Sequence, residues 1–501
     1  MKYSIKSALL CFCVAASSQA MAKNSISDDK FRQLEENLPT PNTYRTASGA
    51  PGHQYWQQDV DYKIDITLND EKQTLSGSET IDYTNNSPDT LRYLWLQLDQ
   101  NKLAENASSK TTRTAPNKKV TYSGLRNAIE TEAFNGGYNI TQVTGSNGKD
   151  LSYVINGTMM RIDLPKSLKS GDSVELNINW NYQLHEQKVL GGRSGYEYFK
   201  EDDNYLYEIA SWFPRAAAYY DVMGWQNKQF IGSGEFTLEF GDYDVSITVP
   251  ADHVVAATGV LQNPKEVLTK TQRNRLAKAK NADKPVLVIT PEEALANEKS
   301  RSSKTKTWEF EAKNVRDFAF ASSRKFIWDA QGYKGGKTDT MAMSFYPNEG
   351  NPLWEKYSTE SIIHTMEQYN KYTFDYPYPV SISVNGPVGG MEYPMITFNG
   401  PRPTLDKETG EKTYSRATKY GLIGVIIHEV GHNYFPMIVN SDERQWTWMD
   451  EGLNTFLQFV AEQAWEENYP SRRGDAANIT NYMKSNNQVP IMTNSESILQ
   501  F

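Results

Sequence analysis

Polar and apolar residues alternate along short runs through the first half of the chain. The clearest run is Asp-Val-Ser-Ile-Thr-Val at residues 244–249, in which every second side chain is apolar, as in a strand buried on one face. Other strand-like runs, separated by turn-forming residues, cover residues 59–68, 79–83, 91–98, 159–164, 173–180 and 236–240. The pattern predicts an N-terminal all-β domain of sandwich or saddle type over residues 53–310.

The spacing of apolar residues changes from that of strands to that of helices in the second part of the chain. Residues 358–372 place apolar side chains at helical spacing, and the Phe-Asp-Tyr-Pro-Tyr-Pro run at 374–379 stops that helix. Residues 420–427 are almost entirely apolar, as in a helix buried in a domain core. These features predict a mainly α-helical second domain over residues 311–501.

One segment inside the β pattern has a different character. Residues 264–297 carry Lys, Arg, Ala and Glu at helical spacing, with the basic residues in the first half. The basic half is compatible with a polyanion-binding site or with the solvated face of a helix. The second interpretation is favoured, because charge runs of this kind usually face water.

The N-terminus has the features of a targeting segment. Lys2 and Lys6 precede an apolar run at residues 8–16, and Ala-Met-Ala at 20–22 offers a small-x-small cleavage site. We therefore expect a signal peptide over residues 1–22, a flexible polar lead-in over 23–52, and an exported protein that is periplasmic or secreted. The apolar run is too short for a permanent membrane anchor, so stable membrane insertion is not expected.

The composition limits which metal ligands and which binding partners the chain can have. Both cysteines of the chain, Cys11 and Cys13, lie in the predicted signal peptide, so the mature chain would have neither disulfides nor thiolate ligands. The formal net charge is −9, and loss of two lysines with the signal peptide makes it more negative. An acidic balance disfavours nucleic acid and anionic lipid as partners.

The strongest motif is His-Glu-Val-Gly-His at residues 428–432, followed after an eighteen-residue gap by Glu451. Residues four apart share one face of a helix, so His428 and His432 can bind a single ion. Glu451 supplies a third, oxygen ligand, and two His plus one Glu with a position left for water is the donor set of a catalytic zinc site. Glu429, beside the first ligand, is placed to take a proton from metal-activated water.

The flanking residues suggest how two helices present this motif. Pro436 follows the second histidine closely and is expected to end the first helix. Asp450 is expected to cap a second helix over residues 452–465, which would carry Glu451 near its start.

A second motif, Gly-Gly-Met-Glu at 389–392, lies upstream of the histidines. Two glycines beside an extended segment let a peptide backbone approach closely, in the manner of strand addition. The carboxylate of Glu392 could then pair with the free ammonium of a substrate. By itself the motif is weak, because a Gly-Gly turn followed by a surface glutamate is its usual explanation.

Together with Trp-Met-Asp-Glu-Gly at 448–452, these motifs resemble those of the aminopeptidase N family of zinc metallopeptidases, the gluzincin aminopeptidases. The resemblance implies a thermolysin-like catalytic domain, one Zn²⁺ per chain and peptide substrates with a free N-terminus. It also implies the following roles: zinc ligands His428, His432 and Glu451; general base Glu429; an anchor for the substrate amino group at Glu392; and a cleft for the substrate backbone lined by Gly389, Gly390 and Met391.

The chain departs from the family pattern at two places. Tyr393 stands where the family motif ends in Asn, which puts that contact in doubt. The family also uses a tyrosine several dozen residues beyond the third ligand to stabilise the oxyanion, and Tyr469 and Tyr482 come too early for that role. We therefore expect a chain truncated at its C-terminus, weak or inactive, with the catalytic tyrosine and a helical domain beyond Phe501.

The β domain offers one further candidate. Family members place a carboxylate or amide of this domain near the amino end of the substrate. Glu208, in the segment Tyr-Leu-Tyr-Glu-Ile-Ala-Ser-Trp at 205–212, is at about the right position. An ordinary strand glutamate is an equally good interpretation.

The main alternative is a non-catalytic exported zinc-binding protein whose β domain binds a peptide or glycan. The missing catalytic tyrosine supports it, and so does a set of aromatic residues in the β domain: Tyr196, Tyr198, Tyr205, Tyr207, Trp212, Tyr219, Tyr220 and Trp225. Aromatic clusters are more often core than ligand platforms, however. The intact Glu429 also favours an enzyme, because a structural zinc site has no use for a base.

Overall fold

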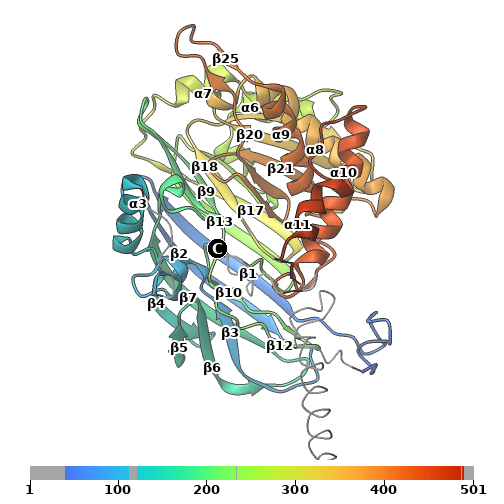
Figure 1. Cartoon of the computed structure of the whole chain (residues 1–501). Helices are drawn as coiled ribbons and strands as arrows, with labels where there is room; N and C mark the ends of the chain where they lie inside the picture. The colour runs from blue at the N-terminus through green and yellow to red at the C-terminus, as the bar shows by residue number, and fades with distance from the viewer. Residues whose placement is uncertain (1–39, 112–120, 233, 487, 490–492, 494–501) are drawn as a thin grey trace, which may run out of the picture.

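The computed structural model describes residues 40–111, 121–232, 234–486, 488–489 and 493. The predicted signal peptide at 1–22 lies outside the described residues. Figure 1 shows a β-rich region at one end of the molecule, coloured blue to green, and a helix-rich region at the other, coloured yellow to red. The predicted fold class, an N-terminal β region followed by a mainly helical region, is confirmed.

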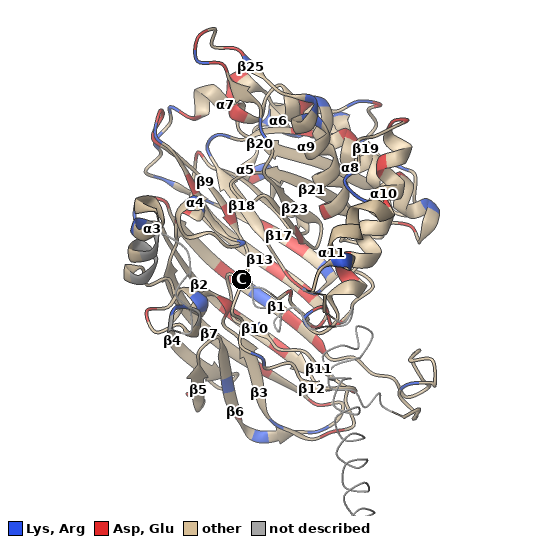
Figure 2. Ribbon diagram, viewed as in Figure 1, with Lys and Arg blue, Asp and Glu red and all other residues tan. Residues whose placement is uncertain are grey.

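A seven-stranded sheet forms the centre of the β region, in the order β15-β17-β13-β1-β2-β7-β4. Its strands are β1 (Asp59–Asn69), β2 (Thr74–Thr84), β4 (Asn139–Gly145), β7 (Ser173–Gln183), β13 (Gly241–Pro250), β15 (Val260–Leu261) and β17 (Thr305–Val315). Alternate residues of β1 are buried, which is the pattern expected of a sheet with one face on the core. Figure 2 shows Asp and Glu along the strands of this sheet, and those of β1 lie on the exposed face.

Two four-stranded sheets complete the β region. One has the order β10-β3-β6-β5, with β3 (Leu91–Gln97), β5 (Tyr153–Asn156), β6 (Met159–Leu168) and β10 (Arg215–Ala216). The other has the order β14-β18-β9-β8, with β8 (Gly195–Phe199), β9 (Asn204–Ile209), β14 (Val254–Ala257) and β18 (Phe320–Ser323). Their buried side chains join those of the large sheet in one hydrophobic cluster.

Two expectations for this part of the chain are wrong. Residues 236–240 do not form a strand, because their carbonyls accept hydrogen bonds from side chains of other segments: Phe236 from Arg316, Thr237 from Gln97 and Leu238 from Asn440. Residues 264–297 are helical only in part. Helices α5 (Pro264–Val267), α6 (Lys270–Ala279) and α7 (Pro291–Asn297) flank a strand, β16 (Val286–Ile289), which pairs with the sheet of the second region.

The helix-rich region is built on a six-stranded mixed sheet of order β16-β19-β20-β21-β23-β22. Its remaining strands are β19 (Ile327–Tyr333), β20 (Thr340–Tyr346), β21 (Val380–Asn385), β22 (Gly390–Tyr393) and β23 (Ile396–Asn399). On one face lies α8 (Leu353–Tyr372), five residues longer at its start than predicted. The hydroxyl of Ser344 on β20 contacts those of Ser358 and Thr359 on α8 at 2.8 and 2.7 Å. The intervening residues of β20 therefore point to the opposite face of the sheet.

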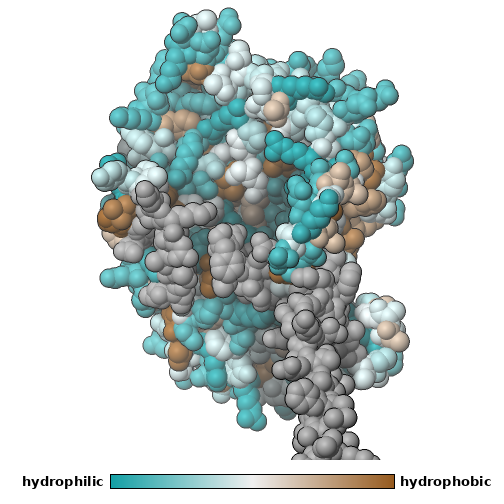
Figure 3. Space-filling model, viewed as in Figure 1, coloured by the Kyte–Doolittle hydropathy of each residue, from teal (hydrophilic) through white to brown (hydrophobic). Residues whose placement is uncertain are grey.

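Two further helices complete this layer, α9 (Arg416–Gly431) and α10 (Leu453–Trp465). Ser415 caps α9 by accepting the amide N–H of Thr418, and most of the apolar residues of α9 are buried, as the sequence predicted. Figure 3 shows a mostly hydrophilic surface with an apolar area over α10, where Leu453 and Phe456 are exposed. In the described part of the chain, no helix combines the length and apolar character needed to cross a bilayer.

Candidate metal and peptide-binding site

The two histidines and Glu451 converge at the end of α9. Nε2 of His428 lies 3.1 Å from Nε2 of His432, and Oε2 of Glu451 lies 3.3 Å and 3.9 Å from these two nitrogens. Zinc–ligand bonds of about 2.0–2.2 Å place neighbouring ligands of a tetrahedral site roughly 3.2–3.6 Å apart. The separations of 3.1 and 3.3 Å are close to this range and that of 3.9 Å is longer, so the three atoms can converge on one ion after a small shift of Glu451.

The other nitrogen of each imidazole has partners of its own. Nδ1 of His428 lies 3.0 Å from Oε1 of Gln458. Nδ1 of His432 lies 2.8 Å from Oδ1 of Asp450 and 2.9 Å from the carbonyl of Phe435. The two acceptor oxygens beside His432 fix its tautomer and leave Nε2 with the free lone pair that a metal needs. Nδ1 of His428 also lies 3.3 Å from Nδ2 of Asn454.

The place of Asp450 corrects an expectation from the sequence. No side chain caps α10, and Asp450 instead belongs to a π-helical turn, Trp448–Gly452, that precedes this helix. Asp450 is fully buried beside His432. This turn also carries Glu451, whose side chain is 45% exposed at the mouth of the site. Burial raises the pKa of Glu451, but the hydrogen bond to His428 and the charge of His432 outweigh it and lower the pKa to about 2.

Glu429 lies on the inner side of the same cluster, against the glycine motif. It is buried, and a Cβ added to Gly390 would stand 2.5 Å from its Oε1. Only glycine at position 390 leaves room for this carboxylate. Burial raises the pKa of Glu429 well above its usual value, and the nearby charge of Glu392 raises it further.

Glu392 joins the site from β22, the edge strand of the six-stranded sheet. Carboxylate oxygens of Glu392 and Glu429 and a ring nitrogen of His432 lie within 4.8 Å of one another. Burial raises the pKa of Glu392 to about 8, although the charge of His432 opposes that shift. Next to it Met391 is buried, whereas a Cβ on Gly389 would meet no atom within 4 Å, so this end of the strand is open.

The β region contributes a carboxylate that the sequence did not single out. Glu235 lines the same small cavity as Glu392, and it is held by the guanidinium of Arg193, whose Nη2 lies 2.6 Å from Oε1. Glu208 is placed differently. It is fully buried, and its Oε2 accepts the amide N–H of Val388 at 2.8 Å.

The segment between the second and third ligands is bound to the β region. We call residues 440–444 (Asn-Ser-Asp-Glu-Arg) the anchor segment. The carboxylate of Asp442 accepts hydrogen bonds from the side chains of Tyr220, Gln226 and Thr237. Glu443 forms an ion pair with Arg316, and Asn440 contacts both Arg316 and the carbonyl of Leu238. Arg444 donates to the carbonyls of Lys228 and Gln229.

The anchor segment was also missed from the sequence. Its only signal is three consecutive charged residues, Asp442, Glu443 and Arg444, in the interval between two ligands, all of them buried in the structure. A buried charge requires partners, but the sequence does not say which distant residues supply them.

The two tyrosines that follow Glu451 in the sequence, and Tyr393, lie in the following environments. Tyr469 is buried and donates a hydrogen bond to the carbonyl of Tyr420 at 2.7 Å, whereas Tyr482 is partly exposed on α11 (Thr480–Lys484). Tyr393 is buried beside Glu392. Within the aromatic set of the β region, Tyr196, Tyr198, Tyr205 and Tyr207 pack against one another.

Comparison with known proteins gives consistent matches. Residues 354–500 match the model of the Peptidase family M1 domain. Over 130 residues the chain is 26% identical to "Aminopeptidase M1-A" of Oryza sativa subsp. japonica, and this match spans 25% of the chain and 14% of that relative.

Among solved structures, the M1 zinc metallopeptidase from Deinococcus radiodurans is similar with a TM-score of 0.55 and 14% identity, over 90% of this chain and 80% of that one. A two-domain M1 zinc metallopeptidase mutant bound to L-arginine is similar with a TM-score of 0.50 and 15% identity, over 82% and 72%. At such identities the likeness establishes the fold.

Proposed function

We propose that the chain is a zinc-dependent aminopeptidase that removes N-terminal residues from peptides, because residues 354–500 match the model of the Peptidase family M1 domain. One observation carries the proposal: Glu392 and Glu429 cluster with His432, one of the three candidate zinc ligands, beside an edge strand. The charge pattern of residues 1–22 supports a periplasmic or secreted location.

The donor set fits zinc. His428, His432 and Glu451 would hold the ion, with their outer contacts already in place. When bound, zinc lowers the pKa of a coordinated water to about 7 and polarises a carbonyl.

Glu429 would act as the base. Its carboxylate would accept the proton of the attacking water and pass it to the amine that leaves when the peptide bond breaks. Such acid–base catalysis is worth about 10²–10⁴ in rate. Gly390 permits this position, since any side chain there would displace the carboxylate.

The glycine motif would hold the peptide. Among the strands that the structure describes, β22 pairs with β23 alone, so its other edge can take an extended peptide. Glu392 would pair with the α-ammonium group at the end of that peptide, and Glu235 adds a second carboxylate nearby. A blocked terminus would leave these buried carboxylates unpaired, so a preference for free N-termini is expected.

Two variants test the proposal. Glu429→Gln should lower turnover of an unblocked peptide about 10²–10⁴-fold while metal analysis still finds zinc. Full activity in that variant would overturn the role of the base.

Glu392→Gln keeps the size of the side chain and removes its charge. It should abolish the preference for free over N-acetylated peptides. Equal cleavage of both by the unchanged chain would point to an endopeptidase with the same metal site. Zinc binding without any hydrolysis would point to the non-catalytic alternative.

A further inference from the structure

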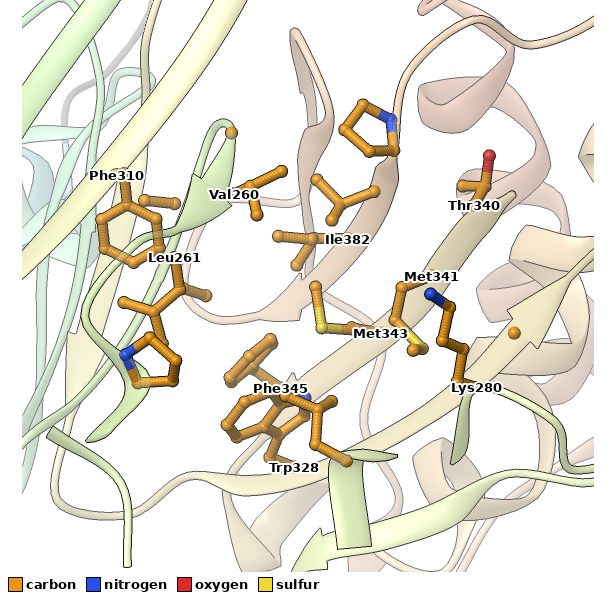
Figure 4. A pocket seen from close by; sticks show the side chains of 18 of the residues that line it. Val260, Leu261, Lys280, Phe310, Trp328, Thr340, Met341, Met343, Phe345 and Ile382 are labelled. Carbon is orange, nitrogen blue, oxygen red and sulfur yellow. The ribbon is translucent and has the colours of Figure 1, made fainter. Parts of the chain in front are cut away.

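A second cavity lies on the face of the six-stranded sheet that α8 and α9 leave free. Its volume is about 320 Å³. Figure 4 shows Met341, Met343 and Phe345 of β20 and Ile382 of β21 directed into it. The three residues of β20 alternate with Ala342 and Ser344, whose hydroxyl contacts α8, and Ile382 is paired with Met343 in the neighbouring strand. The zinc ligands approach the sheet from the helical side, so this cavity is separate from the metal site.

The opposite wall comes from the β region. Val260 and Leu261 of β15 and Phe310 of β17 face the methionines, and Trp328 closes one end (Figure 4). The lining is therefore almost wholly apolar, and it combines strands of two sheets. Small-molecule sites typically have volumes of about 300–1,000 Å³ and this kind of lining. The space suits a chain of about ten carbon atoms.

The rim of the cavity carries an excess of positive charge. Lys280, Lys334 and Asp339 stand there, and Lys334 donates to Oδ1 of Asn281 at 2.6 Å. Figure 4 shows the side chain of Lys280 extending toward Met341. Over the described ranges of the chain, its ammonium group has no hydrogen-bond or ion-pair partner. A cation beside an apolar cavity matches an amphiphile with an anionic head.

The wall also contains donors without acceptors. The indole N–H groups of Trp308 and Trp328, both buried, lack a hydrogen-bond partner among the residues described. These donors lie beside the apolar lining, whereas the place of an anionic head group is given by Lys280 at the rim.

We propose that this cavity binds a medium-chain carboxylate, with the alkyl chain between β15 and β20 and the carboxylate at Lys280. The site is independent of the proposed peptidase activity. It requires neither zinc nor Glu429.

Calorimetric titration of the full chain with decanoate, decanol and decyltrimethylammonium tests the ligand class. Decanoate should bind with a Kd in the micromolar range, about fivefold or more tighter than decanol, and the cation should bind most weakly. Absence of saturable decanoate binding, or equal binding of the cation, would overturn the proposal.

Two variants test the location. Met341→Trp fills the cavity and should weaken decanoate and decanol alike, at least tenfold. Lys280→Glu should weaken decanoate about tenfold and leave decanol unchanged. Lys278→Glu is the matched control, because it makes the same charge change on α6 without lining the cavity, and it should behave as the unchanged chain. Unaltered decanoate binding in Lys280→Glu would refute the carboxylate position even if Met341→Trp fails to fold.

Discussion

The three proposed zinc ligands are held in two different ways. His428 and His432 stand at the end of a buried helix whose neighbours, α8 and α10, belong to the same region. Glu451 follows a segment whose principal contacts are with the β region, through Asp442, Glu443 and Arg444. One half of the site is thus built locally, and the other half depends on how the two regions meet.

In the local half, His428 is held by more than one side chain. Asn454 of α10 donates to the carbonyl of His428 at 2.9 Å and accepts from the hydroxyl of Tyr369 on α8. Gln458 contacts the ring of His428 as well. In the other half, a single carboxylate, Asp442, gathers three side chains of the β region. Loss of one contact should therefore matter less near the histidines than in the anchor segment.

The largest effect is expected where the anchor contains a buried ion pair. Arg316 and Glu443 are almost completely buried, and Arg316 also binds Asn440 and the carbonyl of Phe236. Arg316→Met would leave Glu443 buried without its partner, which typically costs about 3–5 kcal/mol. Urea denaturation should show this loss of stability, and competition with a chromophoric chelator should show weaker zinc binding.

The double variant Arg316→Met/Glu443→Leu separates stability from positioning. An apolar replacement of the whole pair should restore most of the stability. Zinc binding should stay weak, because the anchor segment has lost its fixed point. Recovery of both quantities would mean that the pair has no part in placing Glu451.

The next prediction concerns the pH dependence of stability at a contact of α8, the helix that packs beside α9 in the local half. Asp329 of β19 is buried and accepts hydrogen bonds from Tyr346 and from Thr359 of α8. Burial raises its pKa to about 7, against the lowering effect of these two hydrogen bonds. Between about pH 4 and 7 the folded chain keeps a proton that the unfolded chain has lost, so the free energy of unfolding falls as the pH rises.

The variant Asp329→Asn removes this titration. Relative to the unchanged chain it should gain stability, by about 3 kcal/mol, between pH 5 and pH 8. Paired urea curves at the two pH values measure the difference. Glu360→Gln, at an exposed position of α8, is the control for a general change in charge. A constant difference between the two chains across this range would contradict the assignment to Asp329.

A smaller effect is expected from Asp442→Asn. Asparagine has one acceptor oxygen in place of two, so it cannot satisfy Tyr220, Gln226 and Thr237 together. Zinc affinity should fall roughly tenfold or more, in the range found for residues that support metal ligands. Tyr220→Phe removes a single donor and should cost less; an equal or greater loss in Tyr220→Phe would contradict the shared role of Asp442.

The smallest effect is expected from Gln458→Ala, although Gln458 contacts a zinc ligand directly. Asn454 and the helix itself still hold His428, so zinc affinity should fall roughly fivefold, about the worth of one hydrogen bond. The comparison would fail if this variant lost more zinc affinity than Asp442→Asn.

The elements that follow from a regular pattern of apolar residues could be predicted from the sequence. Alternation located β1 and β13, and an unbroken apolar run located α9. Prediction failed where a residue's partner is distant in sequence. Residues 236–240 have the composition of a strand, but their carbonyls accept hydrogen bonds from Arg316 and Asn440. Asp450 is a residue type that often caps helices, but its side chain lies against His432. No local pattern identifies Glu235 or the anchor segment, because both depend on the fit of two regions.

The order of strands in the large sheet has a consequence during synthesis. Strand β1 pairs with β2 on one side, but its other neighbour is β13, with Tyr62 opposite Tyr243. At a ribosomal rate of about 5–20 residues per second, β1 waits roughly 10–40 seconds for that partner. Through this interval one edge of the nascent hairpin is open to other chains. The charges at Asp59, Asp61, Lys63 and Asp65, on every second position of β1, are the kind that discourage such pairing.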